Sequence, residues 1–162
     1  MEFHSCRISR AKCRVRRADT PLVRHVAIIH PEYLALILAG RKRVEVRLTR
    51  NRCTPFGRVA PGDVVYFKAR SGGFGARATV AVVDEFEELS PPLVAMLFRR
   101  YNAMACGDAA YWISKQYARF GTIVHLTDVR STECGPEYRD APGFSPRSSW
   151  IVLRRAATRR AS

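Results

Sequence analysis

The chain has 162 residues, of which 47% are hydrophobic, and its formal net charge at pH 7 is +14. This length and apolar content suit one folded domain. No apolar run approaches the roughly 20 residues that cross a bilayer, and residues 1–24 lack the apolar region of a secretory signal, so we expect a cytoplasmic protein without a membrane span.

The positive charge is concentrated at the two ends of the chain. Residues 1–24 hold seven Lys or Arg against two acids, and residues 154–162 hold four Arg and no acid, which leaves +5 for the centre. Basic segments with few aromatic residues cannot bury enough apolar area to fold alone. We therefore predict a disordered arm over 1–24, a folded domain over 25–153 and a disordered tail over 154–162. Such arms add salt-sensitive attraction to polyanions; a solubilising tail, an over-extended N-terminus and an organelle transit peptide are the alternatives.

The cysteines indicate neither a disulfide framework nor a metal site. Cys6, Cys13, Cys53, Cys106 and Cys134 are an odd number, and they include no C-x-x-C pair. Zinc sites and disulfide-rich domains need regular ligand spacing. We expect no metal, no cofactor and a reducing compartment.

Apolar periodicity and turn signals predict about six strands and three helices. In chain order we expect a strand over 25–29, a helix over 31–39, a strand over 44–48, a polar loop over 49–62, a strand over 63–69, a turn over 71–75, a strand over 77–86, a helix starting at Ser90-Pro91-Pro92, a helix from Asp108 through Arg119, a strand over 121–129, a loop over 130–146 and a strand over 150–153. Alternation in the strand over 77–86 places Val80 and Val82 on one face. Because helices do not regularly separate the strands, the order favours an α+β fold with a mostly antiparallel, barrel-like sheet rather than a parallel one.

The stretch Gly40-Arg41-Lys42-Arg43-Val44-Glu45-Val46-Arg47 carries the strongest functional signal. Proline suits the first turn of the preceding helix, and glycine suits its end. In a strand that starts at position 44, the side chains of Glu45 and Arg47 share one face, and the apolar residues fill the other. Such a pattern is also typical of an ordinary amphipathic strand with a solvated face. The helix before it and the Pro61-Gly62-Asp63 turn after it favour a polar site on a rigid sheet.

This order resembles the ASCH family of the PUA-like superfamily. The matching residues are Lys42, Glu45 and Arg47 of the family's G-x-K-x-x-E-x-R segment, the helix that ends at Gly40, and the later P-G-D turn before a strand. The resemblance covers roughly residues 25–153. It implies a β pseudo-barrel flanked by about three helices, with a ligand cleft where the G-x-K-x-x-E-x-R strand meets the helices.

Cationic and carboxylate groups in such a cleft can hold a phosphate and the edge of a base, and aromatic faces can stack on an unpaired base. We expect Trp112 to share a polar helix with Lys115 and Trp150 to open the last strand; core packing is the alternative for both rings. The expected ligand-binding set is Lys42, Glu45, Arg47, Trp112, Lys115 and Trp150. The expected partner is RNA, another single-stranded nucleic acid or a modified nucleoside, as the resemblance to PUA-like domains also implies.

Two enzymatic alternatives stay open beside this binding module. One ASCH-related bacterial group removes the acyl group from N4-acetylcytidine with a lysine, a threonine three residues later and a downstream glutamate. Lys42 matches the lysine, but Glu45 stands in the place of the threonine, and no glutamate occurs between Glu88 and Glu133. Some family members are also reported to cleave RNA. In either enzyme Lys42 and Glu45 would be the catalytic residues. In a ribonuclease Arg47 would supply the cation at the phosphate, and His30 or His125 are alternatives for the proton transfer.

Overall fold

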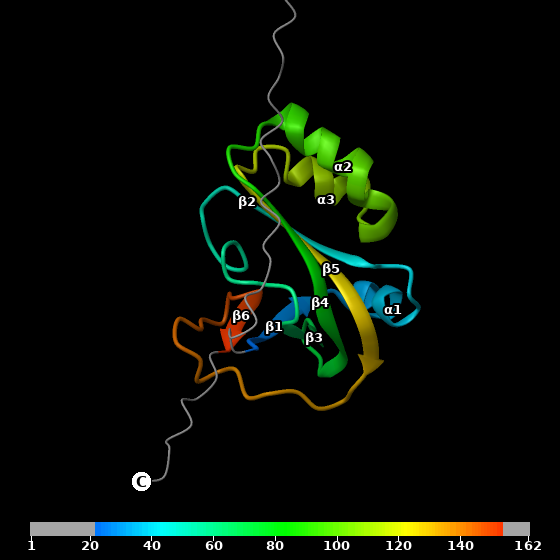
Figure 1. The fold of residues 1–162 in the computed structure, drawn as a ribbon, viewed down its shortest axis with the longest axis vertical. Helices are drawn as coiled ribbons and strands as arrows, with labels where there is room; N and C mark the ends of the chain where they lie inside the picture. The colour runs from blue at the N-terminus through cyan, green and yellow to red at the C-terminus, as the bar shows by residue number, and fades with distance from the viewer. Residues whose placement is uncertain (1–21, 154–162) are drawn as a thin grey trace, which may run out of the picture.

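The computed structural model describes residues 22–153, which form one six-stranded sheet and three helices (Figure 1). The elements are β1 (Arg24–Ile29), α1 (Pro31–Leu38), β2 (Val44–Thr49), β3 (Val64–Ala69), β4 (Phe74–Phe86), α2 (Pro91–Ala105), α3 (Ala109–Ser114), β5 (Phe120–Ser131) and β6 (Trp150–Leu153). The arm predicted over 1–24 and the tail predicted over 154–162 lie outside the described residues, apart from residues 22–24. Within the described part, no helix is long and apolar enough to cross a membrane.

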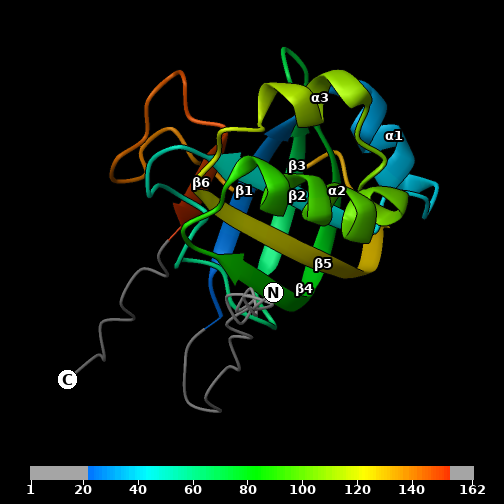
Figure 2. The ribbon, with the colours of Figure 1, turned by 90° about the horizontal axis from the view of Figure 1, so that it is seen from above.

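The strands follow the order β2-β5-β4-β3-β1-β6, and only the β1–β3 pair is parallel. The sheet curves into a half-barrel, which confirms the predicted α+β pseudo-barrel with mostly antiparallel strands (Figure 1). Figure 2 shows α2 and α3 side by side over the β2 end of the sheet, with α1 beside them. Curvature therefore brings β2, at one edge of the sheet, toward β1 and β6 at the other.

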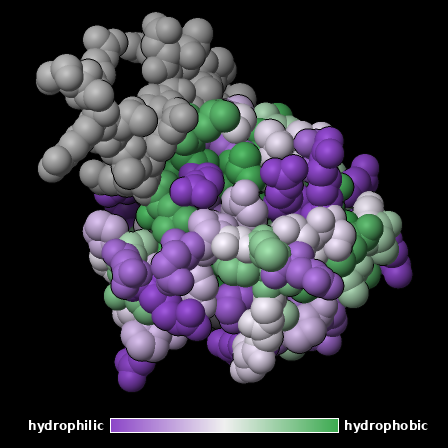
Figure 3. All heavy atoms as spheres, turned by 90° about the horizontal axis from the view of Figure 1, so that it is seen from below, coloured by the Kyte–Doolittle hydropathy of each residue, from purple (hydrophilic) through white to green (hydrophobic). Residues whose placement is uncertain are grey.

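Three buried clusters hold these layers together. The inner face of the sheet packs with Ile37 of α1, and the largest fully buried side chain of this cluster is Phe67. A second cluster joins Val44, Val46 and Leu48 of β2 to α2 and α3. The third lies on the outer face of β1, β3 and β6, where the segment 132–149 covers it with residues such as Tyr138. That segment runs along the bottom of Figure 1, and Figure 3 views the molecule from this side, where many hydrophilic residues reach the surface.

The α1–β2 connection follows the sequence prediction. Pro31 opens α1, and Gly40 lies just past its end with a φ of 73°. This left-handed conformation favours glycine, and it lets the backbone N–H groups of Gly40 and Arg41 donate to the last carbonyls of the helix. The turn fixes where β2 begins and therefore which face each of its side chains occupies.

Two predictions about the elements are wrong. Helix α3 ends at Ser114 rather than Arg119, because the chain must turn so that the backbone N–H of Arg119 can donate to Thr49 before β5 begins. The regular alternation of β4 also fails, since a register shift between Val80 and Val82 leaves Val80 buried and Val82 37% exposed. A bulge of this kind adds one residue to the strand and reverses the faces that follow.

Candidate functional site

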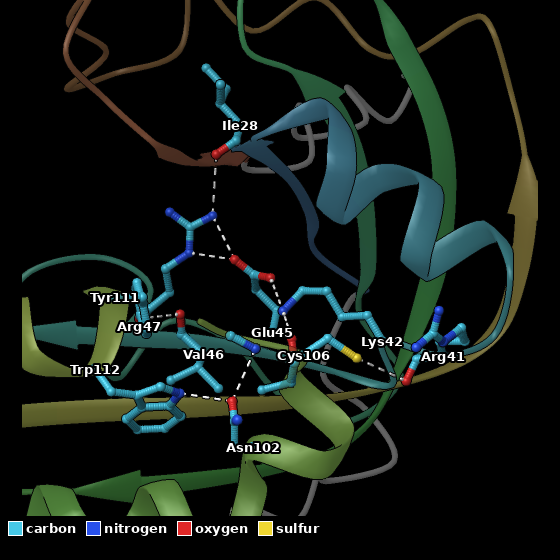
Figure 4. A network of polar contacts seen from close by, with 12 residues as sticks. Ile28, Arg41, Lys42, Glu45, Val46, Arg47, Asn102, Cys106, Tyr111 and Trp112 are labelled. Atoms are coloured by element: carbon cyan, nitrogen blue, oxygen red, sulfur yellow. Dashed lines mark hydrogen bonds and ion pairs between the residues drawn. The ribbon is translucent and has the colours of Figure 1, made fainter. Parts of the chain in front are cut away.

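Strand β2 presents Glu45 and Arg47 on the inner face of the half-barrel, opposite the apolar residues that pack against α2 and α3. Lys42 lies just before the strand, and its backbone N–H donates to Leu36 at the end of α1. The Nζ of Lys42 donates to the carbonyl oxygen of Ala105 at 2.8 Å, which ties the site to the end of α2 (Figure 4). Two helices thus fix the base of the site.

The structure brings the three charged residues of the motif into one buried ion network (Figure 4). Lys42 Nζ lies 3.3 Å from Glu45 Oε2, and Arg47 donates from Nε to Glu45 Oε1 at 2.9 Å. Glu45 is 5% exposed and Lys42 is also 5% exposed. Burial of Glu45 disfavours its charged form, but the neighbouring cations Lys42 and Arg47 outweigh that effect, so the pKa of Glu45 is lowered. The glutamate is therefore ionised at neutral pH.

Arg47 also connects the two edges of the half-barrel. One terminal nitrogen donates to the carbonyl oxygen of Ile28 in β1 at 3.3 Å, and the guanidinium lies 5.4 Å from the ring centre of Trp150 in β6. The indole N–H of Trp150 in turn donates to Nδ1 of His25 at 3.2 Å, and Nε2 of His25 lies 3.0 Å from Asp63 Oδ2. The P-G-D turn of the sequence thus supplies the carboxylate that orients His25, and through it Trp150 and Arg47.

Beside this network lies a cavity of about 1020 Å³, between the ends of β1, β2 and β3 and the segment 132–149. Within the described part of the chain, six Lys or Arg side chains line it against one carboxylate, that of Glu45. These cations are Arg47, Lys68, Arg70, Lys115, Arg139 and Arg147. Four aromatic residues also line the cavity: Tyr33, Tyr111, Tyr138 and Phe144. The hydroxyl of Tyr111 donates to the carbonyl oxygen of Val46 at 3.0 Å, and burial raises its pKa, so this tyrosine stays neutral.

Of the three other expected ligand residues, Lys115, Trp112 and Trp150, only Lys115 lines the cavity. Lys115 lines the cavity, although it lies past the end of α3. Trp150 is 3% exposed and lies behind Arg47. Trp112 is 5% exposed, belongs to the cluster under α2, and donates its indole N–H to Asn102 at 2.8 Å (Figure 4); it is not among the residues that line the cavity. Of the two histidines considered, His30 lines the cavity, whereas His125 lies 2.9 Å from Asp84.

Sequence reasoning missed most of the cations that line the cavity. Lys68 and Arg70 lie at the end of β3, and Arg139 and Arg147 lie in the segment 132–149. No local pattern distinguishes them from other surface cations. The sequence offers a partial signal, because Lys68 and Arg70 lie at the end of one predicted strand, and Arg139 and Arg147 lie in the segment between two others.

The half-barrel, its flanking helices and the motif at the cavity define a PUA-like domain of the ASCH type. The sequence model of the ASCH domain matches residues 28–133, so the chain belongs to the ASCH domain family. A search among curated proteins found no match. Within the part of the chain that the structure describes, no group of three or more His, Cys, Asp or Glu is arranged to hold a metal ion.

Solved structures show the same fold. The ASCH protein of Zymomonas mobilis is similar with a TM-score of 0.58 at 20% identity, over 81% of this chain and 87% of that one. A serine-to-alanine variant of that protein matches with a TM-score of 0.61 at 19% identity, over 81% of this chain and 88% of that one. At this identity the likeness supports the fold alone.

Proposed function

We propose that this protein is a binding module for RNA or a modified nucleotide, and that the ligand occupies the cavity beside the Lys42–Glu45–Arg47 network. The excess of six cations over one carboxylate in the cavity lining carries the proposal. Phosphate groups are the ligands that Arg and Lys clusters favour, because guanidinium groups bind phosphate oxygens in pairs and ammonium groups add charge. The single carboxylate is already engaged by two cations, so it does not cancel the others.

The size and aromatic content of the cavity support a nucleotide rather than a free phosphate. Small-molecule sites usually enclose about 300–1,000 Å³, and this cavity, at about 1020 Å³, has room for a nucleotide and part of its neighbour. Its aromatic residues, such as Tyr33 and Phe144, offer surfaces on which an unpaired base can stack. Arms of the charge predicted for 1–24 and 154–162 would add affinity that does not depend on sequence.

The position of Lys42 favours binding over amide hydrolysis. A lysine that attacks or removes a proton must be a neutral amine. Here the Nζ donates to the Ala105 carbonyl and lies 3.3 Å from the Glu45 carboxylate, so two structural contacts already occupy it. Lys42 is also not among the residues that line the cavity. We therefore assign Lys42 a positioning role: it holds Glu45, which holds Arg47 at the cavity.

One observation favours a ribonuclease as the second candidate. His30 is exposed and lines the cavity together with Arg47, Lys68 and Arg70. Cleavage of a phosphodiester without metal needs a group that transfers protons. It also needs cations that stabilise the charge on the phosphate. In such an enzyme His30 would accept the proton of the attacking hydroxyl and then return it to the leaving oxygen. The Glu45 carboxylate, held by two cations, would position Arg47 at the phosphate.

The test measures binding of a fluorescein-labelled 12-nucleotide oligouridylate to the full-length chain by fluorescence anisotropy at low salt. We expect Lys115→Ala and Arg70→Ala to weaken binding, because both residues line the cavity. Arg99→Ala is the matched control, since it removes one exposed positive charge from α2, away from the cavity. Failure of the wild-type protein to bind RNA or any nucleoside at low salt would falsify the proposal.

Product analysis separates the binding module from the two enzymes. The protein is incubated with the labelled RNA and with N4-acetylcytidine, and the products are identified. New RNA ends that form with the wild-type protein but not with His30→Ala would establish the ribonuclease. Release of acetate from N4-acetylcytidine would establish the hydrolase in spite of the position of Lys42. A binding module gives neither product.

A further inference from the structure

A second basic feature lies on the outer face of the sheet, away from the Glu45 network. It is a groove of about 500 Å³, here called the basic groove, which is lined by Arg24, Tyr66, Arg77, Arg130 and residues of the segment 131–136. Its three arginines come from three strands, β1, β4 and β5. Among the described residues that line the groove none is acidic, since Glu133 of this segment is not part of the lining.

Ion pairs within residues 22–153 contribute little to holding these arginines. Arg77 and Arg130 are direct cross-strand neighbours, and like charges in this position destabilise a sheet. Among the described residues, neither Arg24 nor Arg77 has an ion-pair partner, and Arg130 pairs only with Asp128 in a contact whose two side chains are more than half exposed. Exposed pairs of this kind contribute little stability. Three arginines share one groove, and two of them repel each other across neighbouring strands. This arrangement points to an anionic ligand.

An aromatic row links the basic groove to the cavity. Tyr66 in the groove meets Phe74 edge to face at 6.3 Å between ring centres, Phe74 meets Tyr138 at 6.1 Å, and Tyr138 meets Phe144 at 5.7 Å. Tyr138 and Phe144 line the cavity. The chain makes the same connection, because Pro136 in the groove and Tyr138 in the cavity are two residues apart, a span of at most about 7 Å between Cα atoms.

The segment that lies between the two features is held in place from below. A Cβ atom built on Gly135 would lie 2.5 Å from the Phe74 ring, so the backbone packs directly against that ring. The Tyr138 side chain is 6% exposed and anchors the next turn of the segment. The groove and the cavity therefore keep a fixed separation, and one extended ligand can contact both.

We propose that the basic groove is a second subsite for the same ligand strand: it binds backbone phosphates of a single-stranded RNA of which one nucleotide occupies the cavity. This inference rests on the proposed function and narrows it, because it assigns the protein a polynucleotide rather than a free nucleotide. Arg77 and Arg130 hold phosphate oxygens, and the RNA crosses the segment 132–149, which packs on the aromatic row between the two subsites. The face on which the segment 132–149 lies has many hydrophilic residues at its surface (Figure 3).

The experiment compares the salt dependence of binding of the labelled 12-nucleotide oligouridylate among full-length variants. Each phosphate contact to a single strand contributes about 0.7 to the slope of log K against log salt. We expect Arg77→Ala and Arg130→Ala each to lower that slope by about 0.7 and to weaken binding at low salt. Arg99→Ala, which makes the same change in net charge on an exposed helix face, leaves the slope unchanged.

The outcomes distinguish this inference from the proposed function. If Lys115→Ala weakens binding while Arg77→Ala behaves as Arg99→Ala, the groove proposal fails and the proposed function stands. If Arg77→Ala weakens binding while Lys115→Ala does not, the strand does not reach the cavity, and the claim of a shared ligand is overturned. If the wild-type chain binds no RNA, both fail.

Discussion

The cavity and the basic groove are both cationic, but their charges are held in different ways. In the cavity, Arg47 is 15% exposed at its side chain and is fixed by Glu45, by the Ile28 carbonyl and by the ring of Trp150. In the groove, Arg77 is exposed and has no ion-pair partner among the described residues. Buried charges need partners because desolvation is costly, whereas exposed charges keep their water. Substitutions in the Lys42–Glu45–Arg47 network should therefore lower the free energy of unfolding. Substitutions in the groove should weaken ligand binding alone.

The largest expected effect is the loss of Glu45. Glu45→Ala leaves Lys42 and Arg47 without their shared carboxylate in a buried site, and removal of one partner from such a pair costs about 3–5 kcal/mol. The measurement is the free energy of unfolding from urea denaturation. Glu87→Ala is the control, because Glu87 forms an exposed pair with Arg52, and exposed pairs contribute about 0–1 kcal/mol. Equal losses in the two variants would contradict the distinction between buried and exposed charges.

Acid should weaken the fold through the same glutamate. The pKa of Glu45 in the native state lies below its ordinary value of 4.5, because Lys42 and Arg47 outweigh the effect of burial. Its contribution to stability is therefore fully present above pH 4.5 and is lost as the pH falls through the native pKa. Asp63, whose pKa is also lowered despite burial, by hydrogen bonds from His25 and two backbone N–H groups, acts in the same direction.

The measurement for this prediction is the free energy of unfolding at a series of pH values below neutrality. Glu45→Gln should flatten the acid limb of the curve, since the amide does not titrate. The part that remains belongs to Asp63 and other carboxylates. An acid limb that is unchanged in Glu45→Gln would show that the ion network does not stabilise the native state.

Local patterns in the sequence predict part of the site, and tertiary contacts and sheet curvature determine the rest. The alternation of β2 and the glycine before it were sufficient to place Glu45 and Arg47 together on one face, and the strand order was sufficient for the fold class. The long helix predicted from Asp108 through Arg119 was wrong, because a tertiary contact between Arg119 and Thr49 ends it early. The remaining cations of the cavity come from strand ends and from a long irregular segment, whose position depends on curvature of the sheet rather than on local patterns.

A smaller effect is expected behind the network, at Trp150. Trp150→Phe keeps an aromatic ring under Arg47 but removes the N–H that donates to Nδ1 of the fully buried His25. A buried acceptor left without its donor costs about 1–3 kcal/mol, measured as a loss in the free energy of unfolding. Trp112→Phe is a matched control, because the Asn102 oxygen that it abandons still accepts from the N–H of Gly107. The Trp150 variant should therefore lose more stability than the Trp112 variant.

The smallest expected effect on stability is in the groove. Arg77→Ala removes an exposed side chain that lies opposite Arg130 across the strands. The free energy of unfolding should change by less than about 0.5 kcal/mol, because relief of like-charge repulsion offsets the lost contacts. Urea denaturation at low and high salt measures the change, and any gain should shrink at high salt because exposed charges are screened. A loss of 2 kcal/mol or more, on the scale of a buried contact, would make Arg77 a structural residue. Its substitution could then no longer report on phosphate binding, and the division between an ion network that stabilises the fold and a groove that serves only a ligand would have to be abandoned.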